Sequence, residues 1–313
     1  MIGICYLKIL KFVSFVSVFI FLIGFEGISQ SIKVIDSSKS SYREVMIPNT
    51  ELRTLQSELM NQELNLYIKL PVNYYANSEK IYPVWYWTDA NRAFPLVANI
   101  ASILEFPKAG YPDLVIVGIG YPIRDMADWA ALRTRDLTPT NDPGTDSTWA
   151  KILAESSGRK YEVKSGGALL FLNFIVKELI PFVESNYRVS SSDRGLGGYS
   201  DGGLFTLFAL FTHPEAFDRY FAGSPSLDYD NGILFNYENE FALTHKNLKA
   251  TIFLSAGSLE NDGTIENMKK MSEVLQSRNY QGLTLNSYVF PGESHRSCIP
   301  SAIMKAFKVL YKP

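Results

Sequence analysis

The chain has 313 residues, of which 46% are hydrophobic and 20% are charged, and its 30 basic and 32 acidic side chains leave a formal net charge of -2. This composition is typical of a globular protein, and so neutral a chain lacks the basic surface of a nucleic-acid-binding protein. Two cysteines are too few for a disulfide-rich fold or a cysteine-built zinc site, so no metal is expected. The chain also lacks a phosphate-binding loop and a convincing dinucleotide motif, so no cofactor is expected.

The N-terminus has the pattern of an export signal. Two lysines precede an apolar run over residues 12–25, which suits a signal peptide and is short for a membrane span. Small residues precede Gln30 at the spacing of a cleavage site. We therefore expect residues 1–29 to be a signal peptide, residues 30–313 to form one domain, and the mature protein to be periplasmic or extracellular without a membrane anchor. Cys298, its remaining cysteine, is expected to be a small buried residue.

The rest of the chain alternates between predicted strands and helices. Alternating apolar and polar residues predict two early antiparallel strands, over 51–57 and 63–70. Further apolar runs predict strands over 82–87, 114–118, 195–198, 251–256 and 283–289. Helices are expected over 168–185, 202–211, 264–278 and 299–310. This pattern indicates an α/β fold with a mostly parallel central sheet and helices on both faces, which binds ligands beyond the carboxyl ends of its strands.

A candidate nucleophile follows the strand over 195–198. Gly198-Tyr199-Ser200-Asp201-Gly202 matches the G-x-S-x-G pattern and lies between a predicted strand and a predicted helix. This is the setting of the nucleophile elbow, in which glycines allow a tight turn and the serine stands at its tip. Ser200 is therefore the candidate nucleophile; the alternative is a glycine-rich turn with an ordinary serine.

A serine nucleophile needs a base, and the chain has three histidines, all of which follow Ser200. In this fold class the order along the chain is serine, acid, histidine. His295 follows the strand after which the acid is expected, so it is the candidate base. His213, at the end of a predicted helix, and His245, in a polar stretch, are expected to have structural roles.

The acid that orients the histidine is expected just after the strand over 251–256. Glu260 is the preferred candidate, and Asp262 is the alternative. Whichever of the two is not used would cap the helix that follows.

An oxyanion hole needs two preorganised N–H donors. One is expected to be the amide of Asp201, directly after the nucleophile. The other is expected in the loop after the strand over 82–87, where Asn91 is our choice and Asp89 is expected to shape the loop.

These residues belong to a longer pattern that resembles the putative-esterase family of α/β-hydrolases, and most closely its siderophore-esterase-like branch. The matching segments, in the family's order, are YPVWYWTDANR (82–92), VIVGIGYP (115–122), RTRDLTP (133–139), FIVKELIPFVESNYRV (174–189), GGYSDGGLF (197–205), AGSPSLDYDN (222–231), FLSAGSLE (253–260) and PGESH (291–295). Together they span most of the chain from about residue 45 onward.

The resemblance implies an α/β-hydrolase fold with Ser200 as nucleophile, His295 as base and Glu260 as the acid of the glutamate-using members. It also places the amides of Asn91 and Asp201 in the oxyanion hole. The chain departs from the family pattern at Asp89-Ala90, where most members have Asp-Gly. A turn that requires positive φ would be strained there. The acid position also varies within the family.

A long polar stretch at about 124–165 lies where it could form a cap over the site. Its Trp129 and Trp149, together with Tyr229, are the candidates for shaping the substrate pocket; the alternative is that these aromatic side chains only pack.

The pattern as a whole predicts a secreted serine carboxylic-ester hydrolase that works through an acyl-enzyme. Its expected substrate is an acylated or feruloylated saccharide, or a siderophore-type ester. Two alternatives remain: an acyltransferase that uses the same site, and a non-catalytic secreted protein that binds glycans or siderophores. The sequence does not indicate an oligomeric state.

Overall fold

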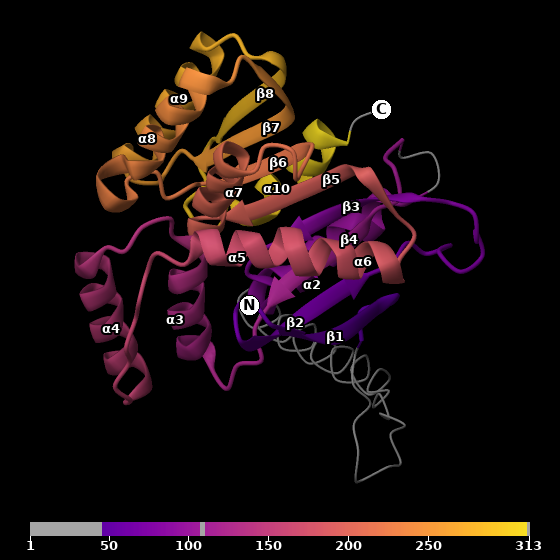
Figure 1. The fold of residues 1–313 in the computed structure, drawn as a ribbon, viewed down its shortest axis with the longest axis horizontal. Coiled ribbons are helices and arrows are strands. Elements are labelled where there is room, and N and C mark those ends of the chain that lie inside the picture. The colour runs from indigo at the N-terminus through magenta and orange to yellow at the C-terminus, as the bar shows by residue number, and fades with distance from the viewer. Residues whose placement is uncertain (1–45, 107–109, 312–313) are drawn as a thin grey trace, which may run out of the picture. The chain divides into compact units, whose positions relative to one another are not determined.

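The computed structural model describes residues 46–106 and 110–311, so the expected signal peptide over residues 1–29 lies outside the described part of the chain (Figure 1). The strands are β1 (Thr50–Ser57), β2 (Gln62–Lys69), β3 (Tyr82–Trp87), β4 (Val115–Gly120), β5 (Val189–Tyr199), β6 (Arg219–Gly223), β7 (Asn247–Gly257) and β8 (Gln281–Phe290). The helices are α2 (Ala90–Leu104), α3 (Met126–Leu137), α4 (Pro143–Ser157), α5 (Ala168–Phe174), α6 (Ile180–Asn186), α7 (Asp201–Thr212), α8 (Tyr229–Thr244), α9 (Asp262–Ser277) and α10 (Ile299–Leu310). Among the described residues, no helix is both long and apolar enough to cross a membrane.

Eight strands of the described chain form one sheet in the order β1-β2-β4-β3-β5-β6-β7-β8. β2 pairs antiparallel with both β1 and β4, and every other neighbouring pair is parallel. The predicted α/β-hydrolase fold, with its mostly parallel sheet, is therefore confirmed. The prediction missed β6, which lies between β5 and β7 and completes the parallel part of the sheet.

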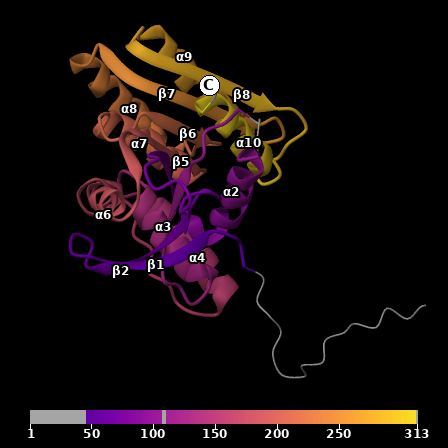
Figure 2. The same ribbon diagram turned by 90° about the vertical axis from the view of Figure 1, so that its right-hand side faces the viewer.

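Helices cover both faces of this sheet, as predicted, and the side chains of β3 show why. Val84 and Tyr86 belong to the core on one face, whereas Trp85 and Trp87 belong to the core on the other. Successive residues of a strand point to opposite faces, so a strand buried on both sides is apolar throughout. Helices α5 to α9 pack on the first core and α2 and α10 on the second; Figure 2 shows α2 and α10 on the opposite side of the sheet from α6, α7 and α8.

Four helices were not predicted, because the usual helical spacing of apolar residues is obscured in their sequences. Helix α2 contains an internal proline, Pro95. Helices α3 and α4 fall within the polar stretch at 124–165, and α4 buries only Leu153. Helix α8 starts with a left-handed turn, since Asp230, Asn231 and Gly232 all have positive φ. The helix predicted over 168–185 consists of α5 and α6, joined by a π-helical segment over Ile175–Leu179.

The loops that follow the parallel strands meet at one edge of the sheet. The Ser200 amide, after β5, donates to Gly223 O at the end of β6 over 2.9 Å. The Ser224 amide, after β6, donates to Ser255 O in β7 over 2.7 Å. This edge therefore brings together residues that are far apart in the chain, as expected for a parallel sheet.

Candidate active site

Ser200 stands at the sharp turn between β5 and α7. Its φ of 62° and ψ of -120° lie outside the regions that L-residues favour, a strain that commonly accompanies functional sites. A Cβ on Gly198 would come within 2.3 Å of Gly202 O, so the turn can close only with glycine there. The amide of Ser200 is bonded to β6, and its carbonyl accepts from the Leu204 amide over 3.0 Å. The turn thus has the geometry of a nucleophile elbow.

Glu260, after β7, and His295, after β8, are hydrogen-bonded to each other. His295 Nδ1 lies 2.6 Å from Glu260 Oε2; the carboxylate side chain is only 2% exposed and the imidazole side chain 45%. The other oxygen, Oε1, accepts from the Gly257 amide over 2.7 Å and from Ser224 Oγ over 2.6 Å. Burial alone would raise the pKa of Glu260, but the hydrogen bonds from His295, Ser224 and Gly257 hold it below its ordinary value.

This lowered pKa predicts a specific pH dependence of stability. A carboxyl group whose pKa is lower in the folded state binds fewer protons there than in the unfolded chain. Its stabilising contribution is therefore complete above the unfolded pKa of 4.5 and is lost as the pH falls through the lower folded pKa. We expect Glu260→Gln to flatten this acid-side loss of unfolding free energy, measured by urea denaturation between about pH 3 and about pH 7.

Glu273→Gln is the matched control, because Glu273 is exposed on α9. Its acid-side slope should follow that of the wild type. An unchanged slope in Glu260→Gln would contradict the inferred ionisation of Glu260.

Tyr199 supports the histidine, a role that sequence reasoning missed. Its ring meets the His295 ring edge-on with 5.1 Å between centroids, and its hydroxyl donates to His295 O over 2.7 Å. Ser224 Oγ lies 2.6 Å from the same hydroxyl and also contacts Glu260. In the sequence, Tyr199 occupies only a variable position of the elbow motif, and Ser224 follows β6, a strand that was not predicted.

The hydroxyl of Ser200 lies on the Ser226 side of the site. Its hydrogen-bond partner within the described chain is Ser226 Oγ, 3.4 Å away, and Ser226 donates to Asp201 Oδ1 over 2.7 Å. No hydrogen bond joins Ser200 to His295 there, although the neighbouring Tyr199 ring contacts the imidazole. Catalytic hydrogen bonds are often long before substrate binds, so this geometry is compatible with a serine that turns towards the histidine.

The two expected oxyanion amides belong to the first turns of different helices. Asp201 is the first residue of α7, and Asn91 is the second residue of α2. Amides in a first helical turn have no acceptor within their own helix, so they remain available to a ligand. The Asn91 side chain fixes the neighbouring loop: its Oδ1 accepts from the Tyr121 amide over 2.8 Å, and its Nδ2 donates to Tyr121 O over 2.9 Å.

The strain expected at Asp89-Ala90 does not arise in the form predicted. The positive φ, 57°, belongs to Asp89, whereas Ala90 is the first residue of α2. Aspartate adopts this left-handed conformation more readily than most residues. The positive φ of this turn thus falls on Asp89, and Ala90 does not need the conformational freedom of glycine.

Arg133, on α3, connects the two helix starts, and sequence reasoning missed it. Its guanidinium donates to both carboxylate oxygens of Asp89, over 2.8 and 3.0 Å, and to Asp201 Oδ2 over 2.5 Å. The arginine side chain is only 9% exposed, and it lies over the Trp129 ring at 5.0 Å. A single buried cation therefore holds together the two helix starts that carry the Asn91 and Asp201 amides.

Two of the three candidate pocket residues line a cavity beside the elbow. Trp149 and Tyr229 face a volume of about 480 Å³ that extends to Ser226 and Asp201. The Tyr229 hydroxyl donates to Thr140 O over 2.7 Å and ties the rim of the cavity to the loop after α3. Trp129 does not line this cavity but packs beneath Arg133.

The remaining candidates lie away from the Glu260–His295 pair. Asp262 is exposed in the first turn of α9, and the cap of that helix is its neighbour Asn261, which accepts from the Thr264 amide over 2.8 Å. His213 and His245 end α7 and α8, consistent with structural roles.

Cys298 is buried, as predicted, and burial raises the pKa of its thiol to about 11. In the described ranges, no group of three His, Cys, Asp or Glu side chains is placed to hold a metal ion.

Comparison with known proteins places this geometry in a family. The family model described as "Putative esterase" matches residues 154–297. Ferri-bacillibactin esterase BesA of Bacillus subtilis is 32% identical over 275 residues, which cover 85% of this chain and 91% of that protein. Siderophore enterobactin esterase of Emericella nidulans is 34% identical over 185 residues, covering 56% of this chain and 57% of that protein.

A solved structure extends the comparison to the fold. The BES protein from Bacillus cereus superposes with a TM-score of 0.73 at 28% sequence identity, over 87% of this chain and 98% of that one. The chain belongs to the putative-esterase family of α/β-hydrolases, within the branch that contains the siderophore esterases, and it is a carboxylic ester hydrolase.

Proposed function

We propose that this enzyme hydrolyses siderophore-type esters, with Ser200 as nucleophile, His295 as general base and Glu260 as the acid that orients the imidazole. The observation that carries this proposal is the 2.6 Å contact between His295 Nδ1 and the buried Glu260 carboxylate, at the same sheet edge as the strained elbow of Ser200. Because Nδ1 is engaged by Glu260, Nε2 is the nitrogen left to take the serine proton.

In the first half-reaction, Ser200 Oγ attacks the ester carbonyl carbon while its proton passes to His295 Nε2. The Asp201 and Asn91 amides then donate to the negatively charged carbonyl oxygen. The carbon–oxygen bond to the alcohol breaks, and His295 returns the proton to the departing alcohol. In the second half-reaction, water attacks the acyl group on Ser200 with His295 again as base, which releases the acid and restores the serine.

The substrate class rests on the relatives, whose names describe them as a ferri-bacillibactin esterase and a siderophore enterobactin esterase. The cavity beside the elbow is consistent with a substrate larger than a simple acetate ester, since about 480 Å³ opens next to Ser226. We also propose that residues 1–29 direct export and are removed, which would place the enzyme where a siderophore ester is met outside the cytoplasm.

A panel of esters tests this proposal. Bacillibactin and enterobactin, each with and without iron, are compared with methyl ferulate and acetylated xylan, and the free acids are measured by chromatography. We expect kcat/KM to be highest for a siderophore ester. A preference for ferulate or acetylxylan would contradict the substrate class, and hydrolysis of no ester by the folded protein would contradict the proposed reaction. A product that joins the acyl group to an added acceptor alcohol, in place of water, would instead indicate acyl transfer.

A further inference from the structure

The hydroxyl proton of Ser226 has a fixed destination. Ser226 Oγ lies 2.7 Å from Asp201 Oδ1, and a carboxylate oxygen can only accept, so Ser226 donates there. A serine hydroxyl has one proton and two lone pairs. In the 3.4 Å contact between the two serine oxygens, Ser200 is therefore the donor and Ser226 the acceptor. The proton that a general base must remove thus points to Ser226 rather than to His295.

Asp201 cannot turn away from Ser226, because Arg133 holds its other carboxylate oxygen. The Arg133 guanidinium donates to Asp201 Oδ2 and, through two parallel bonds, to Asp89. The arginine is buried, so little water competes for these charge-assisted bonds. The direction of the Ser226 proton therefore depends on buried charges rather than on an exposed side chain.

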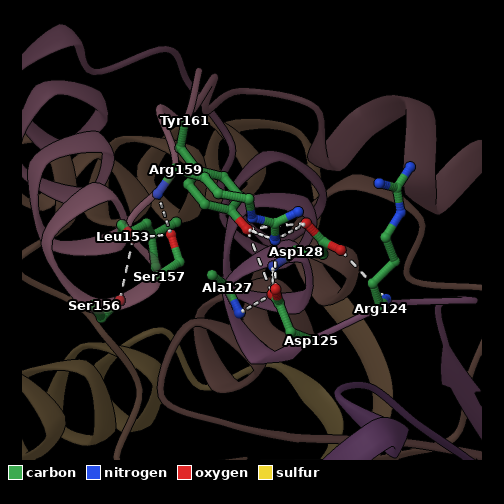
Figure 3. A network of polar contacts seen from close by, with 9 residues as sticks. All are labelled: Arg124, Asp125, Ala127, Asp128, Leu153, Ser156, Ser157, Arg159 and Tyr161. Atoms are coloured by element: carbon green, nitrogen blue, oxygen red, sulfur yellow. Dashed lines mark hydrogen bonds and ion pairs between the residues drawn. The ribbon is translucent and has the colours of Figure 1, made fainter.

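Helix α3, which carries this arginine, is itself fixed at its start (Figure 3). Asp125 caps it by accepting from the Ala127 and Asp128 amides over 2.9 and 3.0 Å. Arg159, from the segment after α4, pairs with both carboxylates, and the Tyr161 hydroxyl donates to Asp128 over 3.0 Å. The helix is therefore held in place before any ligand binds, and so is the cation that it presents to the elbow.

The backbones of the two serines are fixed as well. The Ser226 amide donates to Ser200 O over 3.2 Å, and the Ser226 carbonyl accepts from the Tyr229 amide over 3.2 Å. The Ser200 amide and carbonyl are bonded to Gly223 and Leu204. Rotation about the Cα–Cβ bond is therefore the freedom left to the Ser200 hydroxyl, and its staggered positions decide which neighbour it meets.

Ser226 also faces the cavity beside the elbow. It lines the volume of about 480 Å³ together with Asp201, Trp149 and Tyr229. A ligand in this cavity that carries an N–H or O–H group can donate to the lone pairs of Ser226. Such a donor competes with Ser200 for the same oxygen, so the cavity gives a substrate access to the contact that holds the nucleophile.

We propose that Ser226 is a positioning residue, which holds the Ser200 hydroxyl away from His295 in the free enzyme until a donor group of the substrate occupies Ser226. An ester that leaves the cavity empty must break the contact without compensation, whereas an ester with a donor at Ser226 replaces it. The inference rests on the proposed function, because it takes Ser200 as the nucleophile. A purely structural role has the opposite consequence, since removing a structural hydroxyl would slow the reaction.

The first test is the second-order rate of labelling by diisopropyl fluorophosphate, a small reagent without N–H or O–H donors. Ser200 Oγ bonds to phosphorus, fluoride leaves, and the serine proton passes to His295. We expect Ser226→Ala to react about three- to tenfold faster than the wild type, the gain from removing one competing neutral hydrogen bond. Ser226→Thr, which retains the hydroxyl, should react within about twofold of the wild-type rate.

Ser301→Ala is the matched control, because Ser301 is exposed on α10, and its labelling rate should equal that of the wild type. A Ser226→Ala rate equal to or below the wild-type rate would overturn the proposal. A Ser226→Thr rate as high as that of Ser226→Ala would overturn it too, because the effect would not depend on the hydroxyl. Absence of labelling in the folded wild-type protein would contradict the proposed function on which the inference rests.

The substrate arm compares 4-nitrophenyl acetate with enterobactin, whose amide groups supply N–H donors. In Ser226→Ala, kcat/KM for the acetate should rise about three- to tenfold. For enterobactin it should stay within about twofold of the wild type, because the substrate loses its acceptor as Ser200 loses its partner. An equal rise for both esters would contradict release of Ser200 by the substrate, and a rise for neither would overturn the whole inference.

Discussion

Replacement of His295 by alanine is expected to lower kcat for ester hydrolysis by about 10⁴- to 10⁶-fold, the loss typical of removing the base from a serine hydrolase. The imidazole takes the Ser200 proton and returns it to the leaving alcohol, and no other histidine lies beside Glu260 in the described structure. His295→Ala also removes a hydrogen-bond partner of the buried Glu260 carboxylate, so the free energy of unfolding should fall by about 1–3 kcal/mol.

His245→Ala is the matched control for this loss. That ring stacks on Phe241 with 4.1 Å between centroids at the end of α8, away from the Glu260–His295 pair. Steady-state kinetics on a soluble ester and urea denaturation of both variants check the prediction. A kcat of His295→Ala within about tenfold of the wild-type value would contradict the role of His295 as the base.

The second large effect is expected at Arg133. Arg133→Met leaves the Asp89 and Asp201 carboxylates, whose side chains are only 12% and 15% exposed, without their cation. Removing one partner of a buried ion pair lowers the free energy of unfolding by about 3–5 kcal/mol. We also expect kcat to fall more than KM rises, because Arg133 joins the two helix starts that carry the proposed oxyanion amides, and those amides act mainly in the transition state.

Arg133→Lys is a second variant that tests the same prediction if Arg133→Met does not fold. Lysine retains the charge but cannot make the two parallel bonds to Asp89, so it should recover part of the stability and less of the kcat. Lys80→Met is the surface control: its pair with Asp113 is solvent-exposed, and its loss should cost less than about 1 kcal/mol. Equal stability losses at Arg133 and Lys80 would contradict the buried role of the arginine.

The fold was predictable where the hydrophobic pattern was continuous. Strand β3 is apolar throughout because both of its faces are covered, and its predicted bounds, 82–87, are those observed. Strand β6 has only five residues, so its short apolar run did not stand out from the helix end before it. In α2, Pro95 obscured a helix whose buried face includes Val97 and Ala101.

The contacts of the candidate site were predictable where the expected roles follow chain order, and less so where they depend on tertiary contacts. Glu260 and His295 were chosen from the serine–acid–histidine order, and the structure brings the two together across 35 residues. Arg133 was missed because its partners, Asp89 and Asp201, lie 44 and 68 residues away and no local pattern links them.

The partner of the Ser200 hydroxyl also lay beyond sequence reasoning. Ser226 approaches Ser200 through a contact between the segments after β5 and β6, in which its backbone amide donates to Ser200 O over 3.2 Å. Trp129 was a candidate for shaping the substrate pocket, with packing as the alternative. Arg92 and Arg133 lie over its ring at 5.2 and 5.0 Å, and it does not line the cavity beside the elbow.

The measurement that tests the central claim most directly is intact mass spectrometry of the purified protein after incubation with a fluorophosphonate. An activated serine attacks phosphorus and displaces fluoride, so the wild type should gain the mass of one phosphonyl group. Ser200→Ala should gain none, whereas Ser226→Ala, which removes the hydroxyl 3.4 Å away, should still be labelled. A folded wild-type protein that takes up no label, or a Ser200→Ala variant that is labelled as well as the wild type, would contradict Ser200 as the nucleophile.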